Sequence, residues 1–249
     1  MKILIIGATS GIAKECARIW AARSTSASPN SLVLVARNAE SLATTSADLR
    51  VRNKTAEVLT YASSLTDTEE ISRLEPQLRA GGPYDVVLIA QGELTQQSEA
   101  QSSVSALHQS LTINATSVAV FAELGARLLE PQGKGTLAIF GSVAGDRTRR
   151  SNYSYGAAKA FLASYVNGMR HRFAGTKVNV VIIKPGPTAT PMTTALATSG
   201  RLAPASAVAA DIVEGIAKGK RQIYTPGIWA IIMLVVRLIP GFIFNKLDF

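Results

Sequence analysis

The chain begins Met1-Lys2-Ile3-Leu4-Ile5-Ile6-Gly7-Ala8-Thr9-Ser10-Gly11-Ile12-Ala13, and this stretch decides the fold. An apolar run that stops at glycine is typical of a strand buried on both faces of a parallel sheet. It is too short for a secretory signal. The turn and the helix pattern after it would aim backbone N–H groups at a pyrophosphate. We therefore expect dinucleotide binding at Gly7, Thr9, Ser10, Gly11 and Ile12, the alternative being an ordinary tight turn.

Similar apolar runs recur along the chain and alternate with helical patterns. The further expected strands are Leu32–Ala36, Val58–Tyr61, Val86–Ala90, Thr136–Phe140, Val178–Ile183 and Gln222–Thr225. The clearest helical patterns are Gly11–Arg23, Ala39–Val51, Asp67–Leu78, Ser103–Leu129 and Ser154–Phe173. This alternation predicts an α/β fold with a single Rossmann-type, doubly wound parallel sheet of about seven strands flanked by helices. We expect a domain over residues 1–226 and an apolar C-terminal extension over 227–249.

Composition narrows the class of protein. The 249 residues are 47% hydrophobic and 17% charged, which excludes a disordered chain, a collagen and a disulfide scaffold. The net charge of +9 indicates an anionic partner, but no patch of interleaved aromatic and basic residues favours nucleic acid. With Cys16 alone and two histidines, we expect a buried packing cysteine, no metal site and a reducing, cytoplasmic compartment.

Two further segments point to the cofactor. An acidic residue that would hold an NAD ribose is absent after the second strand, where Ala36 is followed by Arg37. Arg37 can pair with a 2′-phosphate, which favours NADP, although NAD stays open and Arg37 could simply be solvated. The small residues Ala90 and Gly92, after the fourth strand, would let a ribose lie against the backbone.

The strongest chemical signal is Tyr155-Gly156-Ala157-Ala158-Lys159. Residues four apart share a helix face, so a phenol stands beside an ammonium group, and we expect the pKa of Tyr155 to fall towards neutral pH. Ser142 could hydrogen-bond the same substrate oxygen. Asn114 lies within a helix pattern, where a buried amide needs partners, and could hold a water near Lys159. The alternative for Tyr155 and Lys159 is an exposed helix pair.

In this order the motifs resemble the short-chain dehydrogenase/reductase family over nearly the whole chain. The resemblance rests on Gly7, Gly11 and Ala13 in the turn and on the set Asn114, Ser142, Tyr155 and Lys159. It implies that Pro185, Gly186, Thr188 and Thr190 hold the nicotinamide end of the cofactor, that Ser64 and Leu65 lie at the adenine, and that the chain forms a homo-oligomer. The family's Asn-Asn-Ala-Gly segment reads Ile89-Ala90-Gln91-Gly92 here, without its usual bracing amides.

Two segments bear on the substrate. Arg147, Arg149 and Arg150 lie between Ser142 and Tyr155 and could clamp a phosphate, or else form ion pairs at a surface or subunit interface. Residues 187–206 are rich in Pro, Thr and Ala, and we expect a mobile loop that closes over the substrate.

The C-terminal segment is apolar but too short to span a bilayer. Gly227–Val236 is uncharged, and the run is then broken by Arg237 and by Pro240-Gly241. We expect two short helices in a membrane interface, with Trp229 and the basic residues at headgroup level. The alternative is a tail packed on the core or on a second subunit.

The arginine segment and the tail together are similar to one subgroup of the family, the decaprenylphosphoryl-2-keto-erythro-pentose reductases. That resemblance implies an NADP-dependent reductase of a keto-sugar carried on a polyprenyl phosphate, working peripherally on the inner face of the cell membrane. Two alternatives remain: a reductase of a membrane-dissolved lipid ketone such as a steroid, retinoid or acyl ketone, and a non-catalytic nucleotide-binding sensor.

Overall fold

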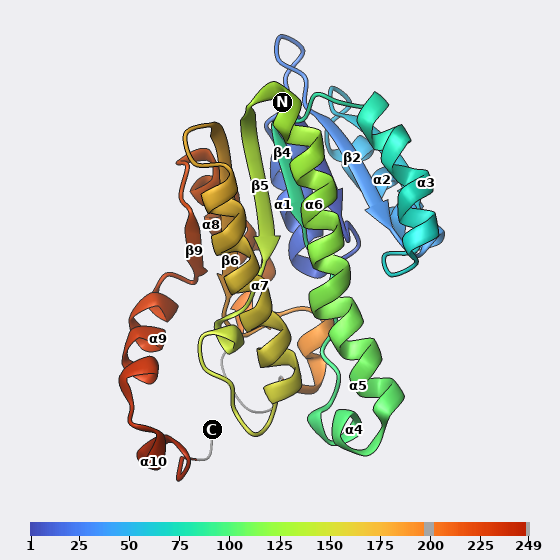
Figure 1. Cartoon of the computed structure of the whole chain (residues 1–249). Helices are drawn as coiled ribbons and strands as arrows, with labels where there is room; N and C mark the ends of the chain where they lie inside the picture. The colour runs from blue at the N-terminus through green and yellow to red at the C-terminus, as the bar shows by residue number, and fades with distance from the viewer. Residues whose placement is uncertain (197–201, 248–249) are drawn as a thin grey trace.

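The computed structural model describes residues 1–196 and 202–247. Its centre is a seven-stranded, all-parallel sheet with the order β3-β2-β1-β4-β5-β6-β9 (Figure 1). The strands of this sheet are β1 Lys2–Ile6, β2 Ser31–Ala36, β3 Glu57–Ala62, β4 Val86–Ile89, β5 Lys134–Phe140, β6 Lys177–Pro185 and β9 Gln222–Thr225. The predicted doubly wound sheet is confirmed, and every strand expected from the sequence is present.

Helices cover both faces of the sheet because the central strands are apolar on both sides. Ile3 and Ile5 of β1 pack with helices α1, α2 and α8, whereas Leu4 and Ile6 pack with α3, α6 and α7. The helices of the first layer are α1 Gly11–Ala22, α2 Ala39–Arg52 and α8 Ala205–Ala217. Those of the second layer are α3 Thr68–Ala80, α6 Ser117–Leu129 and α7 Tyr153–Arg172. Cys16 is fully buried in the first layer, as expected of a packing residue.

The single helix expected over Ser103–Leu129 is instead interrupted. A short helix α4 (Gln97–Ser102) leads into α5 (Val104–Leu111), and one π-helical turn over Thr112–Thr116 separates α5 from α6. The side chain of Asn114 donates to the carbonyl of Ser110 at 3.0 Å, within this turn. A side-chain amide that bonds to the preceding turn competes with the regular backbone ladder, which accounts for the local widening.

The segment expected to be a mobile loop is only partly described. The two-residue strands β7 (Thr188–Ala189) and β8 (Ala203–Pro204) pair with each other, and a 3-10 helix covers Pro191–Leu196. Residues 197–201, the middle of the expected lid, lie outside the described residues. Helix α8 begins directly after β8, and it was not among the helices expected from the sequence.

The C-terminal tail forms two short helices, as the sequence predicted. These are α9 (Ile228–Leu238) and α10 (Gly241–Phe244), which run from the end of β9 along one side of the molecule (Figure 1). In the part of the chain that the structure describes, no helix is both long enough and apolar enough to cross a bilayer.

Candidate active site

The glycine turn lies at the carboxyl ends of the strands, where β1 meets β4. Gly7 has φ +77°, and a Cβ atom there would lie 2.6 Å from the backbone nitrogen of Gln91. Only glycine meets both conditions. Ser10 is the N-cap residue of α1, but its side chain makes no capping hydrogen bond, and the first turn of α1 contains no acidic residue. The positive end of this helix therefore has backbone N–H groups available for an anion.

One cavity, of about 210 Å³, opens on one side of this turn. It is lined by Gly7, Thr9, Ser10, Arg37, Leu65, Thr66, Ala90, Gln91, Gly92, Ile113 and Ser117. Arg37 lines this cavity and is exposed, and its contact with a 2′-phosphate stays a prediction. Ser64 is not among these lining residues, and its hydroxyl accepts from the backbone N–H groups of Thr66 and Asp67 in the turn before α3, so its place at the adenine stays a prediction. Leu65, which was also expected at the adenine, lines the cavity together with Thr66.

The segment after β4 lacks the family's usual asparagines, but the side-chain amide of Gln91 braces it instead. Gln91 is buried, and its Nε2 donates to the hydroxyl of Ser117 at 3.3 Å. Its Oε1 is also buried and has no hydrogen-bond partner. Because Gln91 lines the cavities on both sides of the turn, it is a site residue that sequence reasoning did not identify. Its place in the motif could have identified it.

The second cavity, of about 300 Å³, contains the predicted chemical groups. Ser142, Tyr155 and Lys159 line it together with the turn residues Thr9, Ser10, Gly11 and Ile12. Ala90, Gly92, Pro185, Gly186, Thr188 and Thr190 line it as well. The structure thus brings Ser142, Tyr155 and Lys159 together with the segment predicted to hold the nicotinamide, and Asn114 lies outside the lining. The two cavities share Thr9, Ser10, Ala90, Gln91 and Gly92, and so they adjoin along the turn.

Lys159 is held deep in this cavity, with a side chain only 3% exposed. Its Nζ donates to the carbonyl oxygen of Phe140 at 3.0 Å and lies 5.6 Å from the centre of the Tyr155 ring. Burial disfavours the ammonium form and lowers the pKa of Lys159 to about 8. The residue can therefore gain and lose a proton near neutral pH.

The expected fall in the pKa of Tyr155 is not found. Burial raises this pKa above its usual value, while a hydrogen bond with Ser142 acts in the opposite direction. The reason is that desolvation penalises the phenolate and Lys159 is itself desolvated, so the ammonium group does not outweigh burial. In this state Tyr155 is a protonated phenol at neutral pH, which suits it to donate a proton.

Asn114 braces the wall between these groups. It is fully buried, and its Oδ1 accepts from the backbone N–H of Glu93 at 3.0 Å. A Cβ added to Gly92 would lie 3.1 Å from that Oδ1 and 3.6 Å from Nζ of Lys159, so both side chains face Gly92. Both ends of the Asn114 amide are thus bonded to backbone, and the water expected near Lys159 stays a prediction.

The nicotinamide segment is packed from behind by the tail. Trp229 of α9 presses on Gly186 so closely that a Cβ there would lie 2.0 Å from the indole nitrogen. Thr188 is buried, and its hydroxyl donates to the carbonyl of Gly186 at 2.9 Å. The packing of the tail therefore requires glycine at position 186.

The three arginines have three different surroundings. Arg147 turns away from the cavity and donates to the carbonyl oxygens of Val236 at 2.8 Å and Ile239 at 2.5 Å, at the end of α9. Its guanidinium also lies 3.9 Å from the ring centre of Phe244. Arg149 lines the reactive cavity, and burial lowers its pKa, whereas Arg150 is exposed. The predicted clamp of three is corrected to one arginine in the cavity, because α9 takes up Arg147.

A buried ion pair beside Arg147 also went unnoticed in the sequence. Lys184 donates to Asp146 at 2.5 Å, and both side chains are less than one-tenth exposed. The hydroxyl of Tyr224 donates to the other oxygen of Asp146 at 2.6 Å. This network ties the arginine segment to β6 and β9, so the loop next to Arg149 is fixed from three sides.

Comparisons with known proteins agree with this geometry. The family model described as short chain dehydrogenase matches residues 1–200. An uncharacterized oxidoreductase of Mycobacterium tuberculosis is 33% identical, over 98% of this chain and 96% of its own.

Solved structures share the fold. A bulky-bulky ketone specific alcohol dehydrogenase from Comamonas testosteroni has a TM-score of 0.80 at 21% identity, over 99% of this chain and 94% of its own. A short-chain dehydrogenase from Sphingobium yanoikuyae in complex with NADPH has a TM-score of 0.78 at 22% identity, over 99% and 96%. The chain belongs to the short-chain dehydrogenase family.

Proposed function

We propose that the protein is an NADP(H)-dependent oxidoreductase, able also to use NAD, that reduces a carbonyl group to an alcohol. The observation that carries this proposal is the shared cavity of Ser142, Tyr155 and Lys159 with the glycine turn and Gly186. A nucleotide sensor would need the turn but not a buried lysine beside a half-buried phenol. That combination costs stability and is typical of a site where protons move.

The residues present fit a nicotinamide dinucleotide phosphate. The adjoining cavities give an elongated site, and the uncapped start of α1 suits a pyrophosphate. Arg37 lines the smaller cavity and would pair with a 2′-phosphate. The Sphingobium yanoikuyae enzyme of the same fold was determined with NADPH. Gly7, Thr9, Ser10, Gly11, Ile12, Leu65, Ala90, Gly92, Pro185, Thr188 and Thr190 would complete the site.

When bound, the nicotinamide would supply hydride to the carbonyl carbon. Tyr155, kept protonated by burial, donates its proton to the carbonyl oxygen, and Ser142 orients that oxygen. Lys159 stabilises the phenolate that forms as the proton leaves, and its pKa of about 8 lets it take part in proton return. Asn114 holds the Gly92–Glu93 segment in place opposite Lys159.

For the substrate, we propose a keto-sugar carried on a polyprenyl phosphate at the inner face of a membrane. Two observations support this choice. Lys159 and Arg149 are the charged side chains among the described residues of the reactive cavity, so the cavity is cationic. The apolar tail lies directly behind the cavity wall, through Trp229. A neutral lipid ketone is the second candidate, since it would use the apolar tail without needing Arg149.

The test is a screen of NADPH oxidation with polyprenyl-phosphate keto-sugars and with neutral lipid ketones, in detergent. For the phosphate substrate we expect Arg149→Ala to raise KM by about tenfold or more, because a charge-assisted hydrogen bond is lost. The matched control Arg150→Ala changes an exposed arginine of the same loop and should leave KM unchanged. Equal KM values for Arg149→Ala and wild type would favour the neutral ketone. Tight NADPH binding without turnover on any carbonyl would favour the sensor.

A further inference from the structure

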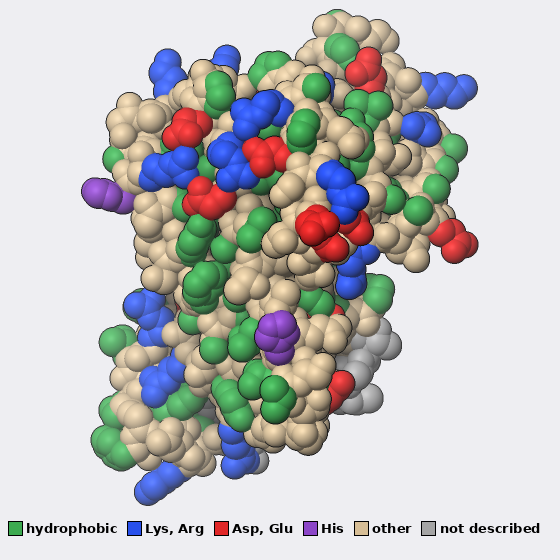
Figure 2. Space-filling model, turned by 45° about the vertical axis from the view of Figure 1, so that its right-hand side comes forward, with side chains coloured by type: hydrophobic (Ala, Val, Ile, Leu, Met, Phe, Trp, Pro, Cys, Tyr) green, Lys and Arg blue, Asp and Glu red, His purple; other side chains and the backbone are tan. Residues whose placement is uncertain are grey.

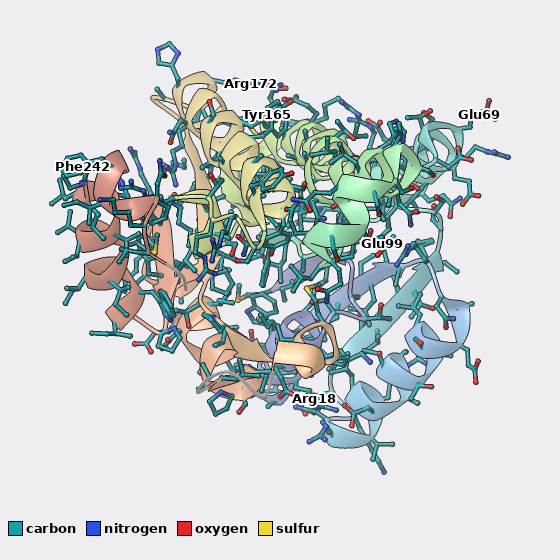
Figure 3. The ribbon with its side chains drawn as sticks, turned by 90° about the horizontal axis from the view of Figure 1, so that it is seen from below. Arg18, Glu69, Glu99, Tyr165, Arg172 and Phe242 are labelled. Carbon is teal, nitrogen blue, oxygen red and sulfur yellow. The ribbon has the colours of Figure 1, made fainter. Side chains whose placement is uncertain are left out.

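The outward surface of the tail is unusually apolar for a helix at the edge of a protein. Met233 is the buried residue of α9, whereas six large apolar side chains of the tail are each more than half exposed. These are Ile228, Ile231, Leu234, Val235, Leu238 and Phe242. In Figure 3, Phe242 lies at the outer edge of the molecule, away from the sheet.

The exposed residues of α9 form one stripe. At about 100° per residue, Ile228, Ile231, Leu234, Val235 and Leu238 fall within an arc of about 120°, and Met233 lies on the opposite side. A stripe of this width is typical of a helix that lies in an interface. Because α9 is only eleven residues long, it lies along such an interface instead of crossing it.

The charges of the tail are mainly basic. Arg237 is exposed about 60° beyond the Leu234 edge of the stripe, and Lys246 is exposed after α10. The one acidic side chain in the sequence of the tail is Asp248. Figure 2 shows Lys and Arg side chains beside hydrophobic ones at the lower left of the face in view. An anionic surface complements both features, since it accepts apolar side chains and pairs with the cations.

The charge argument also separates a bilayer from a second copy of the chain. A two-fold partner would present the same stripe, and so would bring Arg237 and Lys246 of both copies to one interface. The sequence of each tail has one acidic side chain, Asp248, against these two cations, so basic charge remains in excess. Like charges at an interface disfavour association, whereas anionic headgroups favour it.

The stripe is also held in a fixed orientation relative to the reactive cavity. Arg147 binds the last carbonyls of α9 and stacks on Phe244, while Trp229 packs on Gly186 of the cavity wall. Both contacts lie on the inward side of the tail. Whatever binds the stripe therefore sets the position of the cavity with respect to it.

We propose that the tail, residues 227–247, docks the protein on an anionic bilayer through the stripe Ile228, Ile231, Leu234, Val235 and Leu238, with Phe242, Arg237 and Lys246 beside it. This rests on the proposed function only for what the cavity then receives, a carbonyl carried by a lipid. The docking itself follows from the surface of the tail.

The test uses the full-length protein and sucrose-loaded vesicles of phosphatidylcholine, with and without phosphatidylglycerol. We expect sedimentation mainly with the anionic vesicles. Leu234→Glu and Leu238→Glu should each weaken binding by about tenfold or more, because a buried isobutyl group is replaced by a charge. Val51→Glu is the matched control, since Val51 is 82% exposed on α2 and lies outside the tail. It should bind like wild type.

A second pair of variants tests the charge. Lys246→Gln should weaken binding about fivefold, and on anionic vesicles alone, whereas Arg73→Gln on α3 should have no effect. Wild-type binding by the two leucine variants would overturn the proposal. So would a wild-type dimer that Leu238→Glu converts to a monomer, since a second copy would then cover the stripe. Turnover of a water-soluble ketone is measured on the same samples, and its absence with intact vesicle binding would count against the proposed function alone.

Discussion

The buried ammonium group of Lys159 has a consequence for stability that can be measured. Burial lowers its pKa from 10.5 to about 8. One pKa unit corresponds to about 1.4 kcal/mol, so keeping this lysine protonated inside the fold costs about 3 kcal/mol at neutral pH. Lys159→Met keeps the length of the side chain, removes the charge and gives up the hydrogen bond to Phe140.

The sign of the pH dependence follows from proton counting. Below pH 8 the lysine is protonated in both the folded and the unfolded chain, so the cost is constant. Between about pH 8 and 10.5 the unfolded chain binds more protons than the folded one, and the folded state gains stability as pH rises. The wild type should therefore gain about 3 kcal/mol relative to Lys159→Met across this window.

Urea unfolding of both proteins at several pH values from 7 to 10.5 measures this difference. Subtracting the variant removes the titration of other lysines and tyrosines, which the two proteins share. The hydrogen bond to Phe140 shifts the whole curve but not its slope. A difference in unfolding free energy that stays flat with pH would refute the assignment of a depressed lysine pKa.

Three other predictions test separate parts of the account. Arg37→Ala should raise KM for NADPH by about tenfold or more and leave KM for NADH unchanged, since only NADPH carries the 2′-phosphate. If Arg37 is merely solvated, steady-state kinetics will show the same change in KM for both cofactors. Gly186→Ala should lower the free energy of unfolding by about 1–3 kcal/mol through its clash with Trp229, and Trp229→Ala should restore most of that loss in a double-mutant cycle. Arg147→Ala should weaken the packing of the tail on the domain by about 2–4 kcal/mol. Hydrogen exchange should then be faster in 228–247 and unchanged in the sheet. Unaltered exchange would contradict the role of Arg147 in holding α9.

The sequence was most informative where local pattern decides structure. Strands such as Lys2–Ile6 are apolar runs ended by turn residues, and the spacing of Tyr155 and Lys159 is a property of one helix. Those features predicted the doubly wound parallel sheet and most of the residues that line the reactive cavity. The two helices of the tail were also expected, since Pro240-Gly241 divides the apolar run.

Features that depend on packing between distant segments could not be read in this way. Arg147 and Arg149 look alike in sequence, and only the docked carbonyls of α9 separate them. The rise in the pKa of Tyr155 depends on how deeply the cavity is buried, which spacing does not report. Thr66 lines the cofactor cavity and Ser64 does not, and this difference depends on how the turn before α3 folds.

The role of Tyr155 as proton donor is the claim on which the proposed chemistry depends most. The direct measurement is the rate of NADPH-dependent ketone reduction by Tyr155→Phe, with NADPH affinity measured on the same sample by fluorescence. We expect wild-type NADPH binding and a rate lower by about 10²–10⁴-fold, the usual contribution of a positioned general acid. A rate within a few-fold of wild type would contradict the account.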